Sequence, residues 1–247
     1  MKKIFGILAI AAMAVSFNTA CSKNENNGGN GGGGEETVKV RLAGWADDWD
    51  SYVYEYDAEG KVVKASRNDG EREWNFSYNG NVITATGYSE FTITLGTNGY
   101  ASEYKDEWDT FTYTYDSEGY VKQIKKNGEV CANAVVEDGC ILKWSKFEDR
   151  DEDGTAEECW KEHTYTSTKN LAGVYTIYVE KGASRWLQEL GFFGKATKYL
   201  CSANGWDYSN SPSSLEYEFD SKGCVIKEIK KGADYEENYY YTWEYLE

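Results

Sequence analysis

The chain has 247 residues and is strongly acidic, with 42 Asp and Glu against 26 Lys and Arg and a formal net charge of −16. Such an excess of negative charge repels phosphate backbones and anionic lipid headgroups, so we expect no nucleic-acid partner. The length suffices for one β domain with its own hydrophobic core.

The first twenty residues are predicted to be an export signal. Lys2 and Lys3 precede an apolar stretch over residues 4–17 that is too short to span a bilayer as a stable helix. The stretch leads to Cys21 and resembles the signal of bacterial lipoproteins, apart from Asn18 where an aliphatic residue is usual. The resemblance implies lipidation of Cys21. The alternative is an ordinary secretory signal with a free Cys21 thiol.

A polar linker follows the signal. Residues 22–36 contain no apolar side chain and many glycines, so they cannot bury surface and should form a flexible tether. Ser22 stands where an Asp would retain a lipoprotein in the inner membrane, which favours anchoring to outer-membrane lipid. The anchored protein would lie on the periplasmic face or on the cell surface. The predicted organisation is a signal peptide (1–20), an anchored linker (21–36) and one β domain (37–247).

Glycine marks a repeat of about twenty residues through the first half of that domain. Gly60, Gly80, Gly99, Gly119 and Gly139 are 20, 19, 20 and 20 positions apart. Aromatic residues occupy every second position ahead of most of them. Successive side chains of a strand point to opposite faces, so each unit predicts a β-hairpin with one aromatic and one polar face. We therefore expect an all-β fold, an antiparallel hairpin meander curled into a barrel-like or half-barrel sheet.

Three turns share the pattern Asp-x-x-Gly, starting at Asp57, Asp116 and Asp220. With their flanks, residues 54–62, 113–121 and 217–223 resemble the tyrosine-aspartate repeat of large secreted β-shell proteins. The lipoprotein start, the hairpin array and the late Gly-Phe-Phe-Gly-Lys run at 191–195 are also similar to a family of Bacteroidota lipoproteins of unknown function. That resemblance implies a porin-like β fold and no particular activity.

The repeat weakens after residue 145. The pattern predicts one short helix near 184–190, stopped by Gly191, and a long loop over 202–214 that contains Pro212. Most strands keep their alternation for six or seven residues, whereas membrane-spanning strands need about 9–11. We expect the aromatic residues to face a core and the charged residues to face water.

Five cysteines follow Cys21 in the chain, namely Cys131, Cys140, Cys159, Cys201 and Cys224. None has the CxxC spacing of a zinc or redox site. We expect small buried side chains, with one or two disulfides and at least one unpaired thiol, because the number is odd.

An acidic turn is the sharpest local motif. Asp149, Asp151 and Asp153 alternate ahead of Gly154, as in calcium loops, which predicts a structural calcium site. Trp160 stands where such loops place a bidentate Glu. A solvated acidic turn is the alternative.

Four aromatic residues are candidates for ligand binding: Trp206, Tyr208, Trp45 and Trp49. Flat rings flanked by Asp and Asn suit stacking against a sugar whose hydroxyls bond the polar groups. The alternative is that each Trp packs under its own loop.

Catalysis has little support in the sequence. His163 is the single histidine and falls in a probable strand over 161–165, and no Ser or Cys occupies a nucleophile elbow. We expect a non-catalytic envelope lipoprotein that binds a glycan or a partner protein. The alternatives are a structural accessory subunit of an outer-membrane complex and, with weaker support, a carboxylate-dependent glycosidase.

Overall fold

The computed structural model describes residues 38–68, 70–148, 155–176, 182–209 and 211–246. Within these ranges the chain forms sixteen strands and one short helix. In chain order they are β1 (Val40–Ala46), β2 (Ser51–Tyr56), β3 (Val62–Arg67), β4 (Arg72–Asn79), β5 (Val82–Gly87), β6 (Phe91–Leu95), β7 (Ala101–Lys105), β8 (Thr110–Tyr115), β9 (Val121–Lys126), β10 (Glu129–Glu137), β11 (Cys140–Glu148), β12 (Glu157–Lys169), α1 (Arg185–Gln188), β13 (Tyr199–Trp206), β14 (Ser213–Phe219), β15 (Val225–Lys231) and β16 (Glu236–Tyr245).

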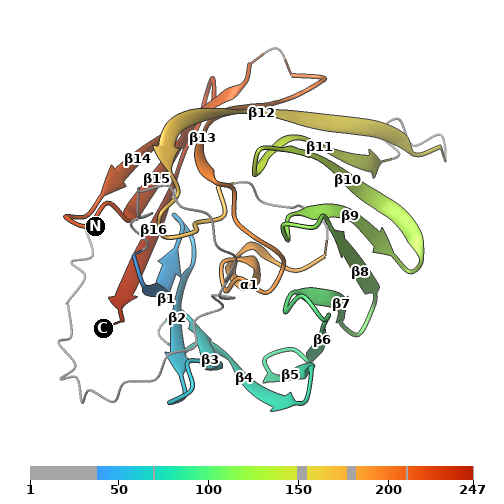
Figure 1. Ribbon diagram of the computed structural model, residues 1–247, viewed down its shortest axis with the longest axis vertical. Helices are drawn as coiled ribbons and strands as arrows, with labels where there is room; N and C mark the ends of the chain where they lie inside the picture. Colours follow the sequence, from blue (N-terminus) through green and yellow to red (C-terminus); the bar gives the residue numbers. More distant parts are fainter. Residues whose placement is uncertain (1–37, 69, 149–154, 177–181, 210, 247) are drawn as a thin grey trace, which may run out of the picture.

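The strands form one closed antiparallel barrel. Each strand pairs with its neighbours in sequence, and β1 pairs with β16 to complete the ring (Figure 1). Because successive strands run in opposite directions, their connections alternate between the two ends of the barrel. We call the end where β1 begins and β16 finishes the proximal end; the β1–β2, β7–β8, β13–β14 and β15–β16 connections lie at the opposite, distal end. The predicted all-β meander is confirmed, and its sheet closes.

The repeated sequence pattern builds the barrel wall as expected. The inward face of β2 carries Tyr52 and Tyr54, both less than 8 % exposed, while the intervening Val53 is 59 % exposed. The second tyrosine of the repeat has a further role, because the Tyr56 hydroxyl donates to the Leu42 carbonyl of β1 at 2.6 Å. Tyr115 does the same for Ala101 of β7 at 2.7 Å. These tyrosines therefore join neighbouring strands as well as filling the interior.

The Asp-x-x-Gly turns lie at the proximal end. In each of them the Asp side chain accepts backbone N–H groups from the turn, and the Gly has a positive φ of 80° (Gly60), 98° (Gly119) or 81° (Gly223). This is the hairpin geometry that favours glycine at the last position.

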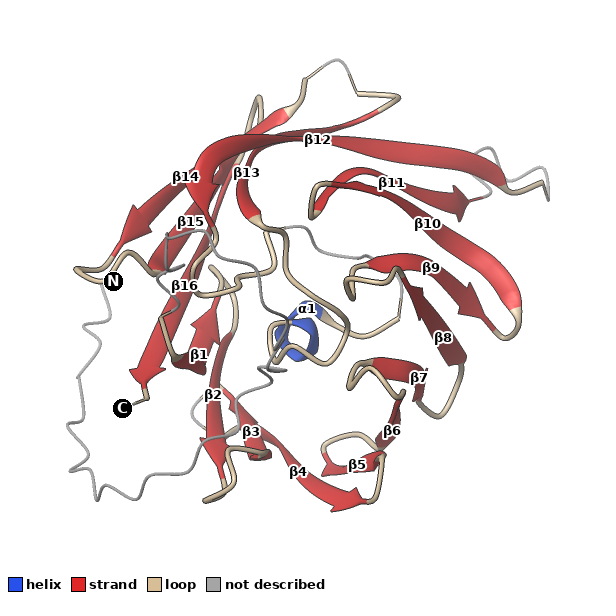
Figure 2. Cartoon of the chain, viewed as in Figure 1, coloured by secondary structure: helices blue, strands red, loops and turns tan. Residues whose placement is uncertain are grey.

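A segment of the chain between β12 and β13 enters the barrel, and we call its described residues, 170–176 and 182–198, the inner segment. The helix α1 lies within the ring of strands (Figure 2). Trp186 stacks on Tyr52 with ring centroids 5.2 Å apart and packs at a tilt against Trp74 at 4.8 Å. The helix, expected over 184–190, covers Arg185–Gln188. No helix among the described residues is long and apolar enough to cross a bilayer.

The same segment is fastened to the proximal turns. The Lys195 N–H donates to the Gly119 carbonyl, and the Lys198 N–H donates to the Gly139 carbonyl, each at 2.9 Å. Gly194 has φ 106°, and a Cβ there would lie 2.9 Å from the Tyr115 ring and 3.1 Å from the Gly119 carbonyl. The glycine of the 191–195 run thus permits close packing of the inner segment on the wall.

Two expectations are wrong in the described residues. No disulfide joins any of the five cysteines after Cys21, so the expected disulfides are absent among them, and four of the five are buried. The loop expected over 202–214 begins later, because β13 continues to Trp206 by pairing with β12. Small polar residues in this stretch hide the alternation that marks the other strands. Several late strands are also longer than six or seven residues, β12 reaching 13.

The Trp186 contacts predict a large effect on stability. Trp186→Ala should lower the free energy of unfolding by about 3–5 kcal/mol, because it leaves a cavity between the inner segment and the wall. Urea unfolding followed by circular dichroism measures this change. Trp108→Ala, at a residue that is 79 % exposed, is the control and should change the value by less than about 0.5 kcal/mol. Equal effects would show that the inner segment does not support the barrel.

Candidate functional site

A polar cavity opens inside the barrel near its distal end. Its volume is about 280 Å³, and it lies between α1 and the strands β1, β12, β13, β15 and β16. The charged residues that line it are Asp47, Lys161, Arg185, Glu228 and Lys230. The uncharged ones are Trp45, His163, Thr176, Asn204 and Tyr239. The mixture of charge, hydrogen-bonding groups and aromatic surface is typical of sites for small polar ligands.

Arg185 brings a buried charge to the cavity from the inner segment. Its guanidinium pairs with Glu189 and with Glu228, each at 3.3 Å, and lies 3.7 Å from the centroid of the Tyr239 ring. One guanidinium therefore forms ion pairs with two buried carboxylates. Burial raises the pKa of Glu189 to about 7, against the opposing charge of Arg185. Burial likewise raises the pKa of Glu228.

Buried polar atoms without a hydrogen-bond partner gather at this cavity. Among the described residues seven such side-chain atoms occur, and five of them belong to its lining. The five are Trp45 Nε1, His163 Nδ1, His163 Nε2, Thr176 Oγ1 and Glu228 Oε2. Leaving a buried polar group unpaired costs about 1–3 kcal/mol, so native structures contain few. The five unpaired atoms around this cavity are therefore available to form hydrogen bonds with a ligand or water.

His163 is held neutral. It lies on β12 opposite Asn204 of β13, is 5 % exposed, and faces the cavity. Burial, reinforced by the charge of Lys161, lowers the pKa of its imidazole to about 3. A neutral imidazole offers one donor and one acceptor. Within the described residues, no group of three or more His, Cys, Asp or Glu side chains is arranged to hold a metal ion.

The four candidate aromatic residues occupy different positions around the distal end. Trp45 is 5 % exposed and lines the cavity, stacked on Tyr239 at 6.2 Å. Trp49 stands on the β1–β2 turn and is 88 % exposed. The structure thus buries one of the two tryptophans near the domain start and exposes the other.

Trp206, the last residue of β13, forms a stacked pair with Tyr208 just after the strand, with ring centroids 5.6 Å apart. The Trp206 ring also contacts two ammonium groups, Lys146 Nζ at 4.2 Å and Lys161 Nζ at 4.8 Å. Lys161 lines the cavity, so it connects this pair to the site. The more open ring is that of Tyr208, which is 48 % exposed.

Two sequence predictions concern residues outside the described ranges. Cys21 precedes residue 38, and Asp149, Asp151 and Asp153 lie between residues 148 and 155. Lipidation and structural calcium therefore stay predictions.

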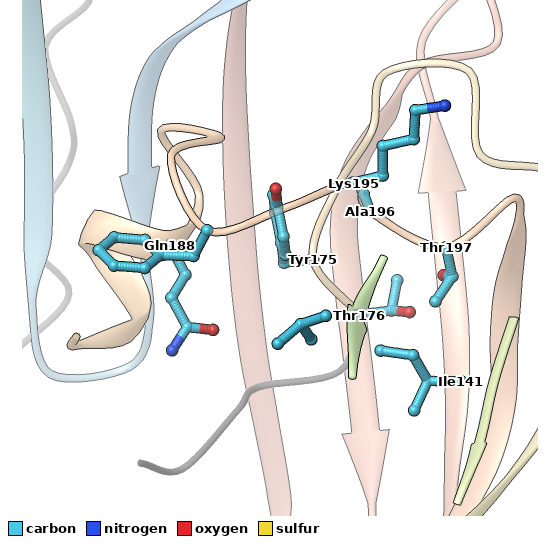
Figure 3. A pocket seen from close by; sticks show the side chains of 9 residues that line it. Ile141, Tyr175, Thr176, Gln188, Lys195, Ala196 and Thr197 are labelled. Carbon is cyan, nitrogen blue, oxygen red and sulfur yellow. The ribbon is translucent and has the colours of Figure 1, made fainter. Parts of the chain in front are cut away.

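A second, much smaller cavity lies between the inner segment and strands β9 and β11. Val121, Ile141, Tyr175, Gln188 and Phe193 are among its lining residues (Figure 3). Its volume of about 20 Å³ is enough for one water molecule and no larger ligand. The distal cavity is therefore the candidate site.

Most of the cavity residues are not among the candidate site residues predicted from the sequence. A signal was present on β12, where Lys161 and His163 share the inward register of Cys159 and Tyr165. Polar residues on the aromatic face of a strand mark a place where the interior is not an apolar core. For Arg185 no such signal exists, because its position depends on the path of the inner segment.

Comparison with known proteins supports the fold. No family model matches the sequence, and no curated protein matches it. A crystal structure of a porin-like protein from Bacteroides uniformis matches with a TM-score of 0.57 and 15 % identity, over 82 % of this chain and 98 % of that one. A porin-like protein from Bacteroides vulgatus matches with a TM-score of 0.60 and 14 % identity, over 83 % and 99 %. At these identities the likeness shows a shared barrel fold.

The neutral His163 predicts a pH dependence of stability. The unfolded chain binds a proton near pH 6.5 and the folded chain only near pH 3, so the unfolded state is favoured as the pH falls below 6.5. Between pH 6.5 and 5 the wild type should lose about 1–2 kcal/mol relative to His163→Gln, whose side chain does not titrate. Urea unfolding of both proteins at each pH measures the difference. NMR titration of the single histidine with a pKa above 6 would contradict the prediction.

Proposed function

We propose that this protein is a non-catalytic envelope protein that binds a glycan in the distal cavity of its barrel. The observation that carries the proposal is the set of unpaired buried donors and acceptors beside the Trp45 indole. Sugar rings present hydroxyls that both donate and accept, and C–H faces that stack on aromatic rings. Neutral His163, Thr176 and Glu228 would bond the hydroxyls, and Trp45 would add its N–H.

The charged exterior of the barrel supports the proposal that the barrel lies in water. Its lipid anchor would hold it near the membrane. Ion pairs between neighbouring strands lie on the outward face, including Lys64–Glu73 at 2.6 Å, Lys231–Glu216 at 2.6 Å and Arg41–Glu244 at 2.7 Å. A Lys or Arg facing lipid at the bilayer midplane would cost about 2–4 kcal/mol. In this proposal Cys21 carries the lipid, and the linker from residue 21 to 36 leads to the proximal end. The distal cavity lies at the end of the barrel opposite the one where the linker joins.

A conservative substitution at Trp45 tests the cavity. Trp45→Phe removes the unpaired indole N–H and keeps an aromatic ring, so glycan affinity should fall about fivefold to tenfold, the value of one hydrogen bond. Isothermal titration calorimetry with glucose, galactose, mannose and xylose and their linear oligosaccharides measures the affinity.

Trp144→Phe is the matched control. Trp144 is also buried with an unpaired Nε1, but it does not line the cavity. Affinity should be unchanged in this variant, with both variants checked for folding by circular dichroism. Equal losses in the two variants, or no binding of any sugar to the wild type, would contradict glycan binding in the cavity. Release of shorter products from a bound oligosaccharide would contradict a non-catalytic role.

Lipid anchoring is tested separately. In an outer-membrane-containing bacterial host, Cys21→Ser should move the protein from the membrane pellet to the soluble periplasmic fraction and abolish incorporation of radiolabelled palmitate. The wild type should stay in the pellet after a high-salt wash, because acyl chains, unlike ionic contacts, are insensitive to salt. A Cys21→Ser protein that stays in the pellet would show that something other than an acyl chain holds it there.

A further inference from the structure

Two turns at the distal end have the same construction. In the β1–β2 turn, Asp47 Oδ1 accepts the backbone N–H groups of Trp49 at 2.8 Å and Asp50 at 2.7 Å. In the β7–β8 turn, Asp106 Oδ1 accepts those of Trp108 at 2.9 Å and Asp109 at 2.8 Å. Both tryptophans are highly exposed, at 88 % and 79 %. Each indole is thus carried outward on a turn that its own hydrogen bonds hold in place.

The turns are also supported alike by the next hairpin. Asn68 donates its side-chain N–H to Asp50 at 3.2 Å, and Asn127 donates to Asp109 at 2.9 Å. A basic residue adds an ion pair in each case, Arg67 to Asp50 and Lys126 to Asp109. The similarity makes Trp108 a built-in reference for Trp49.

The two turns differ in their relation to the cavity. Asp47, the residue that organises the first turn, lines the cavity. Asp48 of the same turn accepts the backbone N–H of Asn238 at 3.0 Å, which holds the turn against β16, next to the cavity residue Tyr239. The β7–β8 turn lies six strands further around the barrel and contributes no residue to the lining. The turn that carries Trp49 therefore borders the cavity, and the turn that carries Trp108 does not.

We infer that the ligand is the end of an uncharged carbohydrate chain, with its terminal sugar in the cavity and a following sugar against the indole of Trp49. This inference rests on the proposed function and specifies it. A cavity of about 280 Å³ lies at the small end of the range for ligand pockets, which suits one sugar and not several. The rest of a chain would leave the cavity past the β1–β2 turn, where Trp49 presents an open aromatic face.

The charges of this turn favour this occupant over others. Asp47, Asp48 and Asp50 flank Trp49 in the chain, Asp50 being paired with Arg67, and the whole chain carries a net charge of −16. Carboxylates accept hydrogen bonds from sugar hydroxyls, but they repel acidic polysaccharides and anionic lipid surfaces. A basic protein segment would also meet attraction here, and the test below separates it from a glycan.

The test compares two variants on two sizes of ligand. Trp49→Ala and Trp108→Ala are measured by calorimetry against free glucose, galactose, mannose and xylose and against their linear tetrasaccharides. For the sugar that binds, Trp49→Ala should weaken the tetrasaccharide about fivefold to tenfold and leave the monosaccharide unchanged, because only the longer ligand reaches the indole. Trp108→Ala should change neither affinity, and both variants should unfold at the wild-type temperature.

The outcomes distinguish this inference from the proposed function. If the wild type binds sugars and the two variants have the same tetrasaccharide affinity, the cavity binds glycan but the glycan chain does not pass over Trp49. The inference then fails and the proposed function stands. If Trp49→Ala weakens monosaccharide and tetrasaccharide equally, Trp49 does not act on a second sugar, and the inference also fails. If no sugar binds, the proposed function and the inference fail together. Binding of polylysine in place of every sugar, lost in Trp49→Ala, would assign the β1–β2 turn to a basic protein.

Discussion

A closed barrel of sixteen strands encloses more space than its own inward side chains fill. Eight strands leave an interior that side chains alone can pack, whereas sixteen leave an open lumen. Here the connection between β12 and β13 turns inward and fills much of that space, with Trp186 packed on Tyr52 and Trp74. The stability of the wall and the content of its interior therefore depend on one internal segment.

The same segment determines the chemistry of the candidate site. It brings Arg185 into contact with Glu228 of β15 and places its own Glu189 on the other side of the guanidinium. Buried charges are costly unless paired, so this arrangement holds α1 in one orientation relative to the wall. The space left between the segment and β12, β13, β15, β16 and β1 is the distal cavity. The inward path of the segment therefore produces both the packed interior around Trp186 and the unfilled polar space beside Arg185.

The two ends of the barrel carry different structural features. At the proximal end, the Asp-x-x-Gly turns and the Gly194 region bring the inner segment and the wall together through backbone hydrogen bonds. At the distal end, the Asp47 and Asp106 turns carry exposed tryptophans, and unpaired polar atoms face a cavity. The regular repeat thus fastens the inner segment at one end, and the features on which the proposed binding rests lie at the other.

Much of the wall could be predicted from local pattern. The alternation of Tyr52, Tyr54 and Tyr56 and the glycine of each turn act through neighbouring residues, so the sequence reveals them directly. The extension of β13 to Trp206 could not be predicted, because its residues Ser202–Gly205 become a strand only by pairing with β12. The absence of disulfides among the described cysteines also depends on which strands lie side by side, which spacing in the sequence does not show.

The sequence by itself determined the kind of fold, a meander of β-hairpins with an aromatic interior, since side-chain alternation and turn chemistry are local properties. Only the tertiary structure decided that the sheet closes through β1 and β16, that the inner segment enters the barrel, and that Trp45 is buried while Trp49 is open to solvent. It also decided that Arg185, Glu228 and His163 meet at one cavity. These residues lie far apart in the chain, and the forces that unite them, ion pairing and the filling of a lumen, act across the barrel.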